Sequence, residues 1–279
     1  MMHPRPSSLV AAPPAFAPPR HDTPTLAQTI AGKASRFLAR NIRTKPLTLH
    51  TNQALVSFTF DDVLVSACTT GAGILERHGI RGTFYVSGGG CGLTSPCGQL
   101  ASVEHLRALH GRGHEIASHT FSHPAISSIP LADLDRDLSR NETFLRAIHG
   151  GIAVRNFAYP YGDFSFSSKR HVEARFDSCR SLIRGVNAGT ADLGTLKSWS
   201  LEITTSRAQM IDVVAEAVRS NGWLIFAAHD VSEHPSRFGV TPDLLDFAIG
   251  TAKAAGCAFA TIADALKLAA GAVRREAAS

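Results

Sequence analysis

The stretch Val56-Ser-Phe-Thr-Phe-Asp-Asp62 decides the fold of this 279-residue chain. Its apolar part is a short run typical of a buried β-strand, and two carboxylates close it. Neighbouring side chains on an extended chain point to opposite sides. Asp61 and Asp62 could therefore divide two roles, with one binding a metal ion and the other facing a substrate. The alternative is that these adjacent acids cap a following helix or are solvated.

Strand and helix patterns alternate from residue 47 onward. Besides the run at 56–60, we expect strands at 82–86, 115–117, 155–159, 181–183, 223–228 and 257–260. Segments with helical periodicity separate them, which favours an α/β fold with parallel strands wrapped by helices. In a barrel of parallel strands, the loops that follow the strands gather on one face. Polar segments that follow different strands should then converge in space.

The segment His119-Thr-Phe-Ser-His123 supplies two imidazoles. Their spacing is that of one helical turn, so both could reach one ion together with Asp62. Alternatively, the pair could arise by chance and bind no metal, because the chain has 13 histidines. His105 and His110 form a similar pair on a segment expected to be an ordinary helix. A short strand that leads directly into His119 favours the metal-binding interpretation.

Two further segments follow strands. His229 ends the apolar run Trp-Leu-Ile-Phe-Ala-Ala and is either a core histidine or an acid/base group. The segment Phe157-Ala-Tyr-Pro-Tyr-Gly162 is either an ordinary turn or part of a site. In a site, the backbone N–H after Pro160 could stabilise an oxyanion, and Tyr159 and Tyr161 could offer faces to a sugar ring.

These four segments, in this order, resemble the polysaccharide deacetylase family, with its NodB-homology domain (carbohydrate esterase family 4). The resemblance spans about residues 50 to 265 and implies an α/β fold, a distorted (β/α) barrel of about seven parallel strands. It also implies a hydrolase that removes acetyl groups from N-acetylated sugars with one divalent metal ion. Zinc is the default, and iron, cobalt, nickel or manganese would also suit a site of mixed nitrogen and oxygen ligands.

The resemblance also implies a role for each matching residue. Asp61 matches the general base, and His229 matches the general acid that protonates the leaving amine. Tyr161 matches the residue whose backbone N–H helps to hold the oxyanion, with Tyr159, Pro160 and Tyr161 at the substrate. The matches to the metal ligands are Asp62, His119 and His123. Loops 88–100 and 230–242 are expected to form walls of the substrate groove.

One position departs from the family pattern. Many members carry an arginine that orients the base, and the nearest position here is Ala158. Arg155 should face the other way on the strand. Two other functions remain open: hydrolysis of a non-sugar amide on the same scaffold, or a catalytically weak carbohydrate-binding module. A module of that kind would have no need for Asp61 beside Asp62, nor for His229 at a strand end.

Composition divides the chain into three parts: a Pro/Ala-rich basic arm with an amphipathic helix (1–45), the catalytic domain (46–272) and a tail (273–279). The arm holds seven basic groups and one acid, so it carries more than the net charge of +5. The remainder is near neutral, which argues against nucleic-acid binding. This basic amphipathic helix could pack on the chain's own domain or on a second subunit, or it could touch a membrane surface or an acidic partner.

The remaining sequence features concern the cellular compartment. Prolines interrupt the apolar part of the first 20 residues, so we expect a cytoplasmic protein, with export left open. Cys91 and Cys97 bracket a Gly/Pro loop. Two reduced thiols are expected there inside a cell, and a local disulfide is the alternative.

Overall fold

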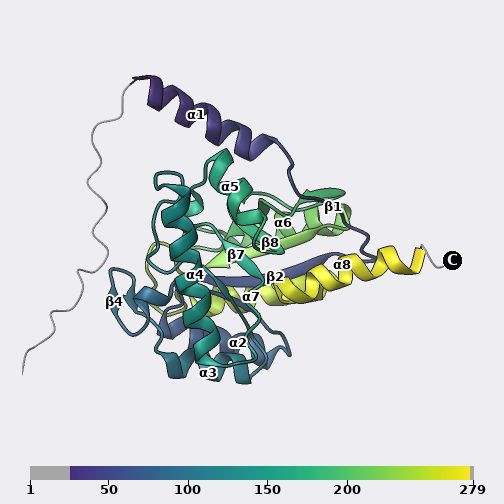
Figure 1. Ribbon diagram of the computed structural model, residues 1–279. Coiled ribbons are helices and arrows are strands. Elements are labelled where there is room, and N and C mark those ends of the chain that lie inside the picture. The colour runs from purple at the N-terminus through teal and green to yellow at the C-terminus, as the bar shows by residue number, and fades with distance from the viewer. Residues whose placement is uncertain (1–25, 277–279) are drawn as a thin grey trace, which may run out of the picture.

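A closed barrel of parallel strands forms the centre of the computed structural model, which describes residues 26–276, and side chains over 31–269 (Figure 1). Strand β11 pairs with β2 and closes the ring in parallel register, which confirms the predicted barrel of about seven strands. In order around the barrel, the strands are β2 (Leu55–Asp61), β3 (Thr83–Val86), β6 (Glu115–Ser118), β7 (Asn156–Ala158), β8 (Ser178–Arg184), β10 (Leu196–Ser200) and β11 (Trp223–Ala228).

The two faces of each strand have different environments. On β2, Val56 and Phe58 pack outward in the large core shared with the helices, whereas Leu55 belongs to a second cluster. That second cluster also contains Trp223, whose indole Nε1 donates to the Ser57 hydroxyl at 2.9 Å. Alternation of this kind follows from the period of two along a strand. It places Asp61 on the same inner face as Leu55 and Ser57.

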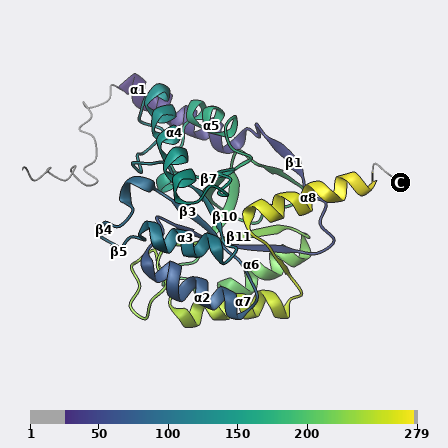
Figure 2. The same cartoon turned by 60° about the horizontal axis from the view of Figure 1, so that its bottom comes forward.

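Helices surround the strands on the outside, as Figures 1 and 2 show from two directions. They are α2 (Ala72–Arg77), α3 (Val103–Gly111), α4 (Leu131–Ile148), α5 (Phe166–Glu173), α6 (Arg207–Arg219) and α7 (Pro242–Ala254). Capping residues fix where some begin: Ser102 and Ser206 form capping boxes at α3 and α6. Helix α8 (Ile262–Glu276) covers the amino ends of the strands, where the Ile262 N–H donates to the Thr83 hydroxyl.

Several short elements depart from regular alternation. Strand β12 (Ala258–Phe259) adds to β2, β1 (Pro46–Thr48) pairs with β9 (Thr190–Asp192), and β4 (Thr94–Ser95) pairs with β5 (Gly98–Gln99). A π-helical turn (Ala67–Gly71) precedes α2, and single 3₁₀ turns lie at Gly88–Gly90 and Pro160–Gly162. No helix separates β8 from β10, which is the distortion of the barrel. No described helix is long and apolar enough to span a membrane.

Helix α1 (Leu26–Asn41) lies beside α5 (Figures 1 and 2). The Ser35 hydroxyl accepts from the N–H of Phe166, and the Arg36 guanidinium pairs with Asp163. Ala39 is buried, whereas Phe37 is 66% exposed. The docked face is therefore not the predicted apolar stripe. Helix α1 thus packs on the chain's own domain, which was one of the expected alternatives, but hydrogen bonds and small residues make the contact rather than the described part of the apolar stripe.

The end of the last helix differs from the expected boundary. Helix α8 continues to Glu276, beyond the expected start of the tail at residue 273, because its Ala-rich sequence favours helix. Residues 277–279 and the Pro/Ala-rich segment 1–25 lie outside the described residues. Cys91 and Cys97 are both free, so the structure has no local disulfide there.

Candidate active site

The sequence-predicted site residues all follow carboxyl ends of barrel strands. Asp61 ends β2, His119 follows β6 (Glu115–Ser118), Tyr161 follows β7 (Asn156–Ala158), and His229 follows β11 (Trp223–Ala228). Because the strands are parallel, these positions lie at one end of the barrel.

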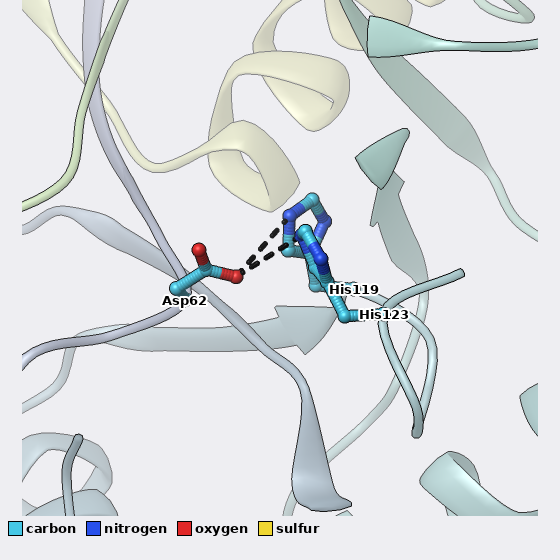
Figure 3. Close-up of side chains that lie close together, drawn as sticks. All are labelled: Asp62, His119 and His123. Atoms are coloured by element: carbon cyan, nitrogen blue, oxygen red, sulfur yellow. Dashed lines mark ion pairs between the residues drawn. The ribbon is translucent and has the colours of Figure 1, made fainter. Parts of the chain in front are cut away.

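Asp62, His119 and His123 converge on one point (Figure 3). The Asp62 Oδ1 atom lies 3.2 Å from His123 Nε2 and 3.8 Å from His119 Nε2. One ligand atom from each residue lies within 4.8 Å of the other two. Two imidazoles and a carboxylate at such distances can hold a divalent transition metal and leave coordination positions open. These residues therefore fit the metal that the sequence predicts.

The His119 imidazole is oriented by the backbone. Its Nδ1 lies 2.8 Å from the carbonyl oxygen of Ala158, which can only accept. The proton must then be on Nδ1, and the Nε2 lone pair faces Asp62. Burial lowers the pKa of His119 to about 4, although the charges of Asp61 and Asp62 oppose this, so the ring is neutral at pH 7. A neutral imidazole cannot form an ion pair with Asp62. Its Nε2 lone pair is instead free to coordinate a metal ion together with the carboxylate.

The segment that carries both imidazoles is a loop, not the helical turn suggested by its spacing. Thr120 and His123 have positive φ angles of 65° and 54°. Hydrogen bonds hold this conformation: the Thr120 hydroxyl accepts from the His123 N–H at 3.0 Å. The Asp137 carboxylate on α4 accepts from the N–H groups of Phe121 and Ser122. Tertiary contacts, rather than local helix geometry, therefore bring the imidazoles together.

Asp61 is held from a neighbouring strand by a residue that the sequence patterns did not reveal. Its Oδ1 pairs with Nη2 of Arg180 on β8, and both side chains are buried. Burial by itself would raise the pKa of Asp61, but the positive charge of Arg180, the largest opposing cause, together with its hydrogen bond lowers that pKa below its usual value. Asp61 is therefore ionised at neutral pH and can accept a proton.

His229 is half-buried at the end of β11 and lies close enough to Asp61 to influence the pKa of that carboxyl. Its ring lies 5.4 Å, centroid to centroid, from that of Phe238. The neighbouring Asp230 does not serve the site directly, because its carboxylate accepts from the N–H and hydroxyl of Ser236. Asp230 instead fixes the loop that carries Phe238.

The Tyr159-Pro160-Tyr161 segment divides between core and surface. Tyr161 has a φ of 59°, is 65% exposed, and packs its ring 4.4 Å from that of His123. Tyr159 is fully buried and donates its hydroxyl to the Gly194 carbonyl. The expectation that the Tyr159 ring contacts a sugar is therefore wrong, because its faces are covered. Pro160 is buried as well, so Tyr161 is the member of this segment that reaches the surface.

Two hollows flank this end of the barrel. One, of about 590 Å³, has walls formed by residues 96–99 and 230–236, which lie in the two loops predicted as groove walls. The other, of about 250 Å³, lies beyond the ends of β8 and β10 and includes Leu182 and Trp199. Most other lining side chains of both hollows are hydroxyls, amides and charged groups. Such surfaces suit a polar, extended ligand.

Comparison with known proteins agrees with this geometry. The sequence profile named Polysaccharide deacetylase matches residues 48–175. Over these residues the chain is similar to the polysaccharide deacetylase family. The relatives described below indicate a hydrolase of carbon–nitrogen bonds other than peptide bonds. The matched range contains Asp61, Asp62, His119, His123 and Tyr161 but ends before Arg180 and His229.

Individual relatives match more than half of this chain. A chitin deacetylase of Colletotrichum lindemuthianum is 24% identical over 221 residues, 79% of this chain and 83% of the relative. A chitooligosaccharide deacetylase of Sinorhizobium fredii is 27% identical over 178 residues, 63% of this chain and 71% of the relative. In fold, the chain is similar to a family 4 acetyl xylan esterase from Clostridium thermocellum, solved in complex with a cobalt ion. That match has a TM-score of 0.55 and 22% identity, covering 77% of this chain and 91% of that one.

Proposed function

We propose that this polysaccharide deacetylase family member removes acetyl groups from N-acetylated sugars within oligo- or polysaccharides, with one divalent metal ion. The observation that carries the proposal is the joint presence of an Asp-His-His ligand set and a separate ionised carboxylate, Asp61, on one barrel face. The named relatives act on chitin or chitooligosaccharides, which are N-acetylated. Zinc is the default ion for such ligands.

Asp62, His119 and His123 would hold the metal ion. When bound, it would lower the pKa of a water molecule and polarise the acetyl carbonyl. Asp61 accepts the proton that this water loses as its oxygen bonds to the carbonyl carbon. The backbone N–H of Tyr161 donates to the oxygen on which negative charge develops.

His229 then donates a proton to the sugar nitrogen as the carbon–nitrogen bond breaks. An amine leaves readily only when protonated, so a general acid is required for an amide substrate. Acetate and a free amino sugar are the products. Both hollows lie beyond the carboxyl ends of barrel strands, at the end of the barrel that carries these residues, which suits binding of an extended sugar chain across that end.

Acetate release from N-acetylated chitooligosaccharides, with and without a chelator, tests this function. Wild-type protein should release acetate, the chelator should abolish the release, and added zinc should restore it. Asp61→Asn should lose at least about 100-fold in kcat while still binding zinc. If acetate is released from a small non-sugar amide but from no glycan, the substrate is a non-sugar amide and the proposal is wrong. Glycan binding without turnover of any substrate would identify a carbohydrate-binding module.

We also propose that helix α1 touches an anionic membrane surface. The observations in support are the exposed Phe37 on the side opposite the docked Ala39, and the exposed Lys33 and Arg40 near it. Basic groups beside an apolar side chain favour anionic lipid headgroups. Co-sedimentation with phosphatidylserine vesicles should fall in Phe37→Ser and at high salt. Equal sedimentation of both proteins would refute this contact.

The predicted cytoplasmic location stays a prediction.

A further inference from the structure

We infer that Arg180 is a positioning residue for the catalytic base: its guanidinium fixes the Asp61 carboxylate for proton acceptance. This inference rests on the proposed function. Arg180 lies on β8 (Ser178–Arg184), inside the barrel, with none of its surface exposed. Its Nη2 pairs with Asp61 Oδ1. One carboxylate oxygen is therefore tied down, and the carboxylate cannot rotate freely about its χ angles.

Strand register explains how this arginine reaches the base. In the parallel pair of β7 and β8, Ala158 is the register partner of Arg180. Register partners point to the same side of a sheet, so both side chains enter the barrel. Ala158 contributes only a methyl group there, and Ala117 on β6 (Glu115–Ser118) is equally small and buried. The space left by these two residues accommodates the guanidinium beside Asp61.

The buried side chain of Lys169 illustrates a cation with a purely structural role, for comparison with Arg180. Lys169 is also fully buried, and its ammonium donates to three acceptors: Asp192 and the carbonyls of Ala39 and Ile42. Burying a charge is costly unless its donors are satisfied in this way. Lys169 therefore ties helix α1 and the β9 segment together.

Arg180 is satisfied much less well. Among the described residues, its Nε and Nη1 atoms have no hydrogen-bond partner. Its guanidinium carbon lies 5.2 Å from the centre of the Tyr85 ring, a weaker contact than a hydrogen bond to a charged group. The pairing with Asp61 is thus its principal described polar interaction. A buried guanidinium with two unpaired nitrogen atoms contributes little to stability. The pair with Asp61 is, however, all that Arg180 needs in order to orient the base.

The test compares wild type, Arg180→Met and the double variant Ala158→Arg/Arg180→Ala, with Lys169→Met as the matched buried-cation control. Acetate release from chitooligosaccharides gives kcat and KM, calorimetry gives zinc affinity, and thermal melting reports the fold. We expect Arg180→Met to lose about 100-fold in kcat, the effect of a slightly misplaced catalytic group, with KM and zinc affinity within about threefold. The double variant should recover at least about tenfold, because an arginine at 158 enters the barrel beside Asp61. Lys169→Met should melt earlier but keep its kcat below its melting temperature.

Wild-type kcat in Arg180→Met would overturn the inference, as would a loss of kcat that only follows a loss of zinc binding. If Arg180→Met does not fold, Arg180→Lys carries the test, because it keeps a buried charge without the planar guanidinium. A tenfold loss of kcat at unchanged zinc affinity would support the inference, and an unchanged kcat would overturn it. Failure of the proposed function looks different, since wild type itself would then release no acetate.

Discussion

Replacing Asp192 by asparagine should destabilise the fold by about 3 to 5 kcal/mol, the usual cost of removing one partner of a buried ion pair. The Asp192 carboxylate lies 2.6 Å from the ammonium of Lys169 and is only 7% exposed. It also accepts from the N–H groups of Lys45 and Gly194, each at 3.0 Å. Asparagine has nearly the same shape but no charge. The ammonium of Lys169 would then remain buried with carbonyl oxygens as its only acceptors.

The pH dependence of this effect follows from the pKa of Asp192. Burial alone would raise it, but hydrogen bonding and the charge of Lys169 outweigh burial and lower the pKa below its ordinary value of 3.8. A carboxylate with a lowered folded-state pKa contributes stability above its unfolded pKa and loses it as pH falls through the folded value. The difference between wild type and Asp192→Asn should therefore be full at pH 7 and shrink below about pH 4.

Urea unfolding at several pH values, followed by circular dichroism, measures this difference. For a domain of this size it corresponds to a melting-temperature loss of about 6 to 20 °C. Lys169→Met should cost less, because Asp192 keeps its backbone donors, and the double variant should resemble Lys169→Met. A difference below about 0.5 kcal/mol at pH 7, or an equal difference at pH 3 and pH 7, would refute the reasoning.

Three further outcomes are expected. Burial raises the pKa of Cys68 and of Cys179 to about 12, so neither thiol should react with a disulfide reagent at pH 8 until the protein unfolds; labelling of both in native protein would contradict this. Gly162→Ala should destabilise by roughly 1 to 3 kcal/mol in urea, because Gly162 has a φ of 60° and a new Cβ would lie 2.8 Å from Leu182, and unchanged stability would count against that contact. Zinc at about 100 times its Kd should add about 2.7 kcal/mol of stability to wild type. Asp62→Asn should lose most of this gain, and an equal gain in both proteins would exclude Asp62 as a ligand.

Much of the barrel could be predicted from the sequence because most of its strands are short apolar runs between helical segments. Strand β11 (Trp223–Ala228) is the clearest example, since all six residues are buried. Strand β10 (Leu196–Ser200) was missed, because its burial varies along its length and Lys197 is exposed. Closure of the barrel was also beyond local patterns, since it depends on β11 pairing with β2 from far along the chain.

The site divides in the same way. Asp62, His119 and His123 could be proposed from residue type and position after strands. Arg180 could not, because the expected strand at 181–183 begins later than the observed β8 (Ser178–Arg184) and leaves this arginine in a loop. Arg155 was expected to face away from the base, and it does: it pairs with Asp177 on the outside.

The backbone conformation of the site could not be predicted from the sequence motifs. Among the described residues, six non-glycine residues have positive φ, and five of them lie at the ends of β2, β6 and β7: Asp62, Val63, Thr120, His123 and Tyr161. Each such residue costs on the order of 1 to 3 kcal/mol and persists only where surrounding structure imposes it. Asp and His adopt a left-handed backbone more often than most residues, but Val, Thr and Tyr do so rarely, so the residue types alone do not predict it. The barrel imposes that conformation through contacts such as those of Asp137 with the loop after β6. The ligand set is therefore arranged by folding itself, so that binding an ion need not supply the energy to assemble it.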